Sequence, residues 1–288
     1  MKNPISYNKR REFSNKLAHF LFATAAFVSI FVLVILLSDL IARGSRFINW
    51  EFFMNFPSRF ASKSGILPAM LGSLWLVVLT ALISIPLSIS AAVYLEEYAM
   101  ENRITRFIKI NISNLAGVPS IVYGILGLSF FVRTLGLGRS ILSGALTMSL
   151  LIMPIMIVAT QEAIRMIPAS LREGSYALGA SKWKTVKGIV LPSALPGILT
   201  GVILAISRAL GESAPLLLVG AFSFVSTLPK GIMDSFIVMP IQIYTWMSKP
   251  SADFRDLTAA AIMILMALLL TLNMTAIIIR NKFQQTYE

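Results

Sequence analysis

The sequence predicts an all-α membrane protein with six transmembrane helices. Hydrophobic residues make up 56% of the 288 residues and charged residues only 13%, against roughly 25% charged in soluble globular proteins. Six charge-free runs occupy 20–38, 64–95, 110–132, 140–161, 188–207 and 257–279. Each is close to or longer than the about 20 residues that a helix needs to cross a bilayer. A soluble domain could not bury this much apolar surface, so we expect a polytopic helical bundle.

Composition excludes several kinds of site. The chain has no cysteine, which rules out disulfides and thiolate metal ligands, and the single histidine, His19, cannot complete a metal site alone. Glycine is nowhere followed by lysine, so a phosphate loop for ATP is absent from the sequence, and we expect no cofactor. The net charge of +12 comes from basic residues spread over short loops. Such loops are typical of membrane margins, so we expect contact with membrane lipid and none with nucleic acid.

The basic residues also predict the orientation. With six spans, the side that holds both termini and the loops 95–109 and 161–187 carries 15 of the 25 Lys and Arg residues. The positive-inside rule therefore places both termini in the cytoplasm. The first 37 residues resemble a signal peptide, but the apolar stretch is long and continues into Asp39 and Arg43 without a small-x-small site. We interpret it as an uncleaved anchor.

An aromatic segment follows the first predicted span, at 43–63. Its alternation of aromatic and polar residues favours a belt at the outer membrane interface over a ligand site. We divide the chain into a tail, first transmembrane helix and outer aromatic loop (1–65), a transmembrane core domain (66–280) and a cytoplasmic tail (281–288).

The third predicted span carries a stripe of small side chains. These recur every three or four residues, as Ser113, Gly117, Ser120, Gly124 and Gly127. Small residues let a second helix approach closely, which is the main source of packing in lipid. Pro119 lies inside the stripe and frees the carbonyl of Leu115, which predicts a kink. A kinked helix carrying Ser120 and Tyr123 suits a moving interface, although ordinary close packing explains the glycines equally well.

The cytoplasmic segment 168–192 predicts two short helices. Pro168 and Ser170 are helix-start signals, Gly179 is a C-terminal cap, and Ser181 can cap a second helix. The first helix would have about eight residues and a length of roughly 12 Å, which is too short to be stable alone. It would expose Glu173 and Tyr176 to the cytosol. An exposed helix of this kind fits a groove on a partner protein.

The same segment resembles a known motif. Glu173, Gly179, Ile189, Leu191 and Pro192 match the EAA loop, E-A-A-x3-G-x9-I-x-L-P, of bacterial ABC importer permeases. Gly174 and Ser175 replace the two alanines and are also small. The resemblance implies a type I ABC importer permease bundle in the bacterial inner membrane. It also implies that the loop docks on a separate cytoplasmic ATPase, and that the permease itself is not an enzyme.

Two further segments are similar to the phosphate importer permeases within that family. The run 117–124 reads Gly-Val-Pro-Ser-Ile-Val-Tyr-Gly, and 207–217 contains Gly-Glu-Ser-Ala-Pro-Leu-Leu, which looks like the PstA branch rather than its PstC paralogue. The resemblance implies a phosphate ion as substrate and a homologous PstC-like permease as partner. It further implies two copies of a PstB-like ATPase, which bind the ATP, and a PstS-like extracytoplasmic binding protein.

The fifth predicted span places charge in the membrane. The face formed by Gly197, Gly201, Ala205, Arg208 and Glu212 repeats at helical spacing, and it should point into the bundle. An intramembrane Arg costs on the order of 3 kcal/mol unless it is paired or hydrated, and its fork fits phosphate oxygens. Arg208 with Glu212 is therefore either part of a translocation pathway, with Ser120 and Tyr123, or a structural pair. Gly211 and Pro215 predict a break, after which 235–246 either re-enters the membrane or lies flat.

Two alternatives to phosphate import stay open from the sequence. Permeases for molybdate or sulfate share the EAA loop, so another oxyanion is compatible with the motif. A membrane scaffold or signalling subunit that reports phosphate status is the alternative from a different class.

Overall fold

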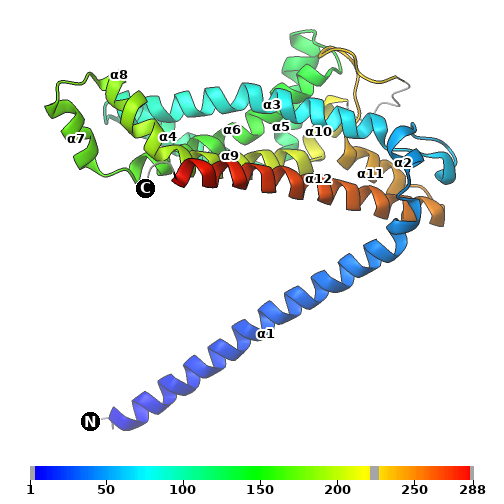
Figure 1. The fold of residues 1–288 in the computed structure, drawn as a ribbon, viewed down its shortest axis with the longest axis horizontal. Helices are drawn as coiled ribbons and strands as arrows, with labels where there is room; N and C mark the ends of the chain where they lie inside the picture. Colours follow the sequence, from blue (N-terminus) through cyan, green and yellow to red (C-terminus); the bar gives the residue numbers. More distant parts are fainter. Residues whose placement is uncertain (1–3, 221–226, 286–288) are drawn as a thin grey trace.

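The computed structural model describes residues 4–220 and 227–285, and helices dominate this part of the chain (Figure 1). Five helices are long and apolar enough to cross a membrane, and a sixth crossing results if one bent helix pair is counted as a single span. The five are α1 (Pro4–Gly44), α3 (Leu67–Val93), α6 (Ile141–Arg165), α9 (Leu191–Gly211) and α12 (Ala252–Gln285), and the bent pair is α4 (Arg103–Leu115) with α5 (Ser120–Gly127). Each overlaps most of one predicted run, which confirms the all-α membrane fold.

Small residues bring α9 close to α6 in the centre of the bundle. A Cβ placed on Gly201 would lie 2.5 Å from the Cβ of Ala159, and one on Gly197 would lie 2.7 Å from that of Ala163. Neither glycine can therefore be enlarged without moving one of the two helices. Both glycines of the fifth span therefore lie against α6.

The third span is broken rather than kinked. The axes of α4 and α5 differ in direction by 102° across residues 116–119. Pro119 caps α5 with φ −54° and ψ 134°, an extended conformation that a continuous helix could not contain. The carbonyl of Leu115, predicted to be freed by Pro119, accepts hydrogen bonds from the Val118 amide at 3.1 Å and from the Tyr123 hydroxyl at 2.8 Å. The kink predicted at Pro119 is therefore present as a full break, because the tight turn at 114–118 ends α4 completely.

The end of the bundle opposite α7 (Ala169–Ala177) holds the aromatic segment. Phe52, in α2 (Trp50–Met54), is only 2% exposed, and its ring centroid lies 6.2 Å from that of Trp246 in α11 (Met239–Met247). Trp50 and Phe60 remain 75% and 62% exposed. The predicted interfacial belt is therefore wrong for Phe52, which the structure uses as core.

The segment before and within α11 packs into the bundle instead of lying on its surface. Phe236 and Val238 are buried, and the amide of Met239 donates to Ser73 Oγ of α3 at 2.8 Å. The predicted break is also present, because α9 ends at Gly211 and a short helix, α10 (Ala214–Val219), follows.

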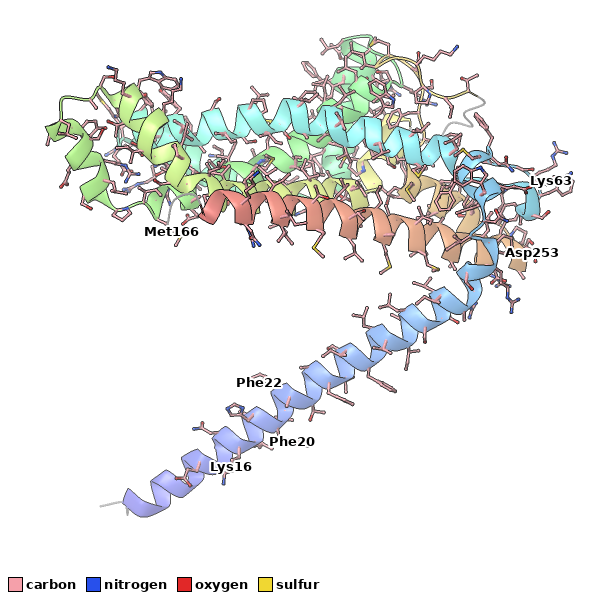
Figure 2. The ribbon with its side chains drawn as sticks, in the orientation of Figure 1. Lys16, Phe20, Phe22, Lys63, Met166 and Asp253 are labelled. Atoms are coloured by element: carbon pink, nitrogen blue, oxygen red, sulfur yellow. The ribbon has the colours of Figure 1, made fainter. Side chains whose placement is uncertain are left out.

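α1 extends away from the remainder of the chain (Figure 1), and Figure 2 shows Phe20 and Phe22 far from every other helix. None of the residues in its most apolar window is buried. Only its last turn meets the bundle, where Gly44 lies against the backbone of Ala259 and Ala260 in α12. The apolar surface of α1 is thus left uncovered by this chain.

Candidate functional site

Two short helices, α7 and α8 (Lys182–Thr185), lie together at one end of the bundle (Figure 1). α7 begins directly after Pro168 and ends in a turn centred on Gly179, whose φ is +77°. The amide of Gly179 donates to the Tyr176 carbonyl at 2.9 Å, and the next amide donates to the Ser175 carbonyl at 3.1 Å. This pair of bonds is the Schellman motif. The predicted helix start at Pro168 and glycine cap at Gly179 are both confirmed.

Side-chain hydroxyls join α7 to α8. The Ser175 hydroxyl is buried and lies 2.8 Å from the Thr185 hydroxyl. Ser181 accepts a bond from the Lys184 amide at 3.4 Å, as its predicted role as a cap requires. A Cβ on Gly174 would meet nothing within 4 Å, so the outer surface of α7 is open at this point.

The base of this loop is apolar and fixed to the bundle. Val186 and Val190 lie in a wide π-turn (Val186–Val190) and are fully buried against Ile164 and Val93. Ile189, Leu191 and Pro192 are half-buried at the same junction, where α9 begins. By contrast Glu173 and Leu178 are exposed, the latter to 90%. The loop therefore presents one face outward from a rigid base.

A cluster of charges under α7 was not anticipated from the sequence. Arg172 binds Glu97 at 2.8 Å, and the neighbouring Glu96 binds both Arg165 at 2.8 Å and Lys109 at 3.2 Å. Glu96 and Glu97 lie in a π-turn, η3 (Tyr94–Tyr98), that continues α3. The signal that could have found it is the acidic pair that ends the charge-free run 64–95.

The residues predicted for the pathway lie on two spans. Tyr123 is buried in α5, and Arg208 lies in the last turn of α9. Arg208 itself is exposed on the surface of this single chain, and Ser120 is half-buried at the start of α5. Ser207, next to Arg208, hydrogen-bonds Asn273 of α12. Among the described residues no hydrogen bond or ion pair joins Tyr123 to Arg208, so their common role in a pathway stays a prediction.

Glu212 is the C-terminal cap of α9. The helix ends at Gly211, and Glu212 follows with φ −84° and ψ 128°. None of the ion pairs between described residues joins Arg208 to Glu212. The shared face of the two residues therefore stays a prediction.

The glycines of the third span serve two different purposes. A Cβ on Gly124 would lie 2.7 Å from the Pro215 Cα of α10, and one on Gly127 would lie 2.1 Å from Thr147 Oγ1 of α6. Both are close-packing positions. Gly117 has only the Asn114 carbonyl nearby, at 3.5 Å, and lies in the break between α4 and α5.

Comparison with known proteins identifies the family of this chain. The family model described as "Binding-protein-dependent transport system inner membrane component" matches residues 84–285, which is most of the chain. The chain belongs to this family. It is therefore the permease component of an ABC importer, a multi-pass inner-membrane protein that is not itself catalytic. The family resemblance seen in the 168–192 motif is confirmed.

Individual relatives support the assignment. The permease is similar to "Phosphate transport system permease protein PstA 1" of Mycobacterium tuberculosis (strain ATCC 25618 / H37Rv), at 37% identity over 94% of this chain and 89% of that protein. It is 40% identical to "Probable ABC transporter permease protein YqgI" of Bacillus subtilis (strain 168), over 72% of this chain and 70% of that one. A solved bacterial alginate ABC transporter, in complex with its periplasmic protein, shares the fold with a TM-score of 0.67 at 16% identity, over 93% of this chain and 94% of that chain.

Proposed function

We propose that this permease forms one half of the translocation pathway of an ATP-driven phosphate importer. The observation that carries the proposal is the position of Arg208, which is exposed on the single chain in the last turn of α9, next to the break after Gly211. Contact with lipid would penalise an exposed Arg in a membrane-spanning helix. A partner permease or water must therefore cover it. A planar guanidinium offers two donors that fit phosphate oxygens. The relatives named PstA support phosphate as the anion.

The uncovered surfaces suggest where partners bind. The outward face of α7, with Glu173 and Leu178, is suited to a PstB-like ATPase pair that binds and hydrolyses the ATP. The apolar length of α1 and the face that carries Arg208 are suited to a homologous PstC-like permease. The opposite end, with α2, would face a PstS-like binding protein.

The orientation in the membrane follows from the same assignment. The α7 end would lie in the cytoplasm, and both chain ends lie toward the α7 side in Figure 1. A reporter enzyme fused after Lys187 should therefore be active inside the cell. Activity outside the membrane would contradict this orientation.

The substrate can be tested with the assembled complex in proteoliposomes. We expect ATP-dependent uptake of labelled phosphate when the binding protein is present, and no uptake without ATP. Molybdate and sulfate serve as matched oxyanions. Uptake of either one in place of phosphate would reassign the substrate, and ATP hydrolysis without uptake of any anion would favour a signalling subunit.

A further inference from the structure

Arg172 attaches α7 to two other parts of the bundle. Its Nε and Nη2 donate to Glu97 Oε1 at 3.0 and 2.8 Å, and its Nη1 and Nη2 donate to the carbonyls of Ile167 and Ile164 at 2.8 and 3.0 Å. Glu97 is only 9% exposed. Hydrogen bonds between charged groups are roughly twice as strong as neutral ones. α7 therefore cannot move far without moving the end of α3 and the end of α6.

The adjacent carboxylate holds different elements. Glu96 accepts from Gln161 at 2.7 Å and from Arg165 at 2.8 Å, both on α6, and it pairs with Lys109 of α4 at 3.2 Å. Its side chain is only 10% exposed. One π-turn thus binds α7 through Glu97 and both α4 and α6 through Glu96. Such wide turns are frequent at functional sites.

α4 carries the connection to the break in the third span. Lys109 lies in α4, and the carbonyl of Leu115 at the end of that helix accepts the Tyr123 hydroxyl at 2.8 Å. The chain from α4 to α5 turns through 102° at this point, so a small displacement of α4 changes where Tyr123 points.

We propose that Glu96, Glu97, Lys109 and Arg172 form a relay that transmits movement of the α7 loop to the break in the third span, at Pro119. The proposal rests on the proposed function, since it requires an ATPase that moves α7. These four are positioning residues, because none of them is placed against the transported ion. The relay connects α7 to this break through side chains on η3 and α4, in addition to the covalent route from α8 into α9.

The relay can be tested in the complete transporter, in proteoliposomes, by measuring anion uptake and ATP hydrolysis together. Glu97→Gln removes the charge that binds Arg172, and Lys109→Gln removes the charge that binds Glu96 and, more weakly, the exposed Glu101. We expect each to lower the number of anions imported per ATP hydrolysed by about tenfold, as for one lost charge-assisted hydrogen bond, with ATPase activity retained. The double variant should be no lower than either single variant, since both links lie in one series.

A matched control lies on the same surface. Glu162 pairs with Arg165 at 3.1 Å but contacts neither α7 nor α4 through any ion pair between described residues, so Glu162→Gln should leave the ratio unchanged. An unchanged ratio in Glu97→Gln, or losses that multiply in the double variant, would overturn the relay. If Glu97→Gln does not assemble, Lys109→Gln decides, because it breaks a different link.

A second measurement distinguishes failure of the relay from failure of the proposed substrate. Spin labels at the exposed positions Leu115 and Leu204 report the distance between α4 and α9. We expect ATP to change this distance in the wild type and the change to be at least halved in Glu97→Gln, whichever anion is imported. Wild-type complex that imports no phosphate refutes the proposed substrate alone, whereas an undiminished distance change in Glu97→Gln refutes the relay alone.

Discussion

Gly179→Val should uncouple the permease from its ATPase without unfolding the bundle. Gly179 has φ +77°, and an added Cβ would meet nothing within 4 Å, so the penalty is conformational and not steric. Left-handed backbone costs an L-residue roughly 1–2 kcal/mol, and a β-branched side chain lies at the upper end. At about 2 kcal/mol, the population of the correctly turned loop falls about thirtyfold, and the apparent affinity for the ATPase falls with it.

Purified ATPase is titrated onto the permease complex in detergent, and the dissociation constant is measured at equilibrium. Gly179→Asn should lose only a few-fold, because Asn tolerates this backbone region. Gly136 provides a control for strain alone, since its φ is +65° and its Cβ position is also open. Gly136→Val should leave ATPase affinity unchanged. Wild-type affinity in Gly179→Val, or an equal loss in Gly136→Val, would refute the reasoning.

Three further changes probe the bundle and the pathway. Gly201→Leu forces a side chain into Ala159 and should destabilise the complex by about 1–3 kcal/mol. Its yield and its melting temperature in a thermal melt should both fall. Gly174→Leu places the same side chain in open space and should leave both unchanged. Tyr123→Phe removes the hydroxyl that binds the Leu115 carbonyl, worth about 1 kcal/mol, and should reduce uptake several-fold at normal complex yield. Arg208→Gln should lower ATP-driven phosphate uptake ten- to hundredfold in vesicles, from the loss of about 1.5–3 kcal/mol of charged hydrogen bonding. Adding Glu212→Gln should not restore it, and restored uptake in the double variant would favour the structural pair.

Local signals in the sequence were sufficient to predict the two short helices of segment 168–192. Pro168 and Ser181 act through the backbone immediately beside them, and Gly179 was assigned a cap because the next helix signal follows at once. Such features depend on three or four neighbouring residues, so the sequence contains all the information they need. The six charge-free runs similarly predict the spans, because the bilayer sets their length.

Features that depend on distant parts of the chain could not be predicted in the same way. Phe52 belongs to the core because Trp246 lies against it, and no local pattern relates the two positions. Arg172 and Glu97 are 75 residues apart, and their pairing requires α3 and α6 to end at the same level. The break at Pro119 also depends on more than the proline itself. A proline alone kinks a helix, whereas the full break depends on the turn that Leu115 and Tyr123 stabilise together.

The end of α9 explains how an Arg can be held in this position without Glu212. Arg208 lies in the last turn of the helix, where the free carbonyl groups carry a partial negative charge that favours a cation. This interaction does not require a carboxylate, and no ion pair between described residues joins Arg208 to Glu212, which follows Gly211 at the end of the helix. The Arg208 side chain is exposed on the single chain. Under the proposed function, an anion that reaches the end of α9 would meet a cation whose donors no paired carboxylate occupies. A close carboxylate would compete with the anion for those donors, which is why Arg208→Gln and the double variant distinguish a pathway from a structural pair.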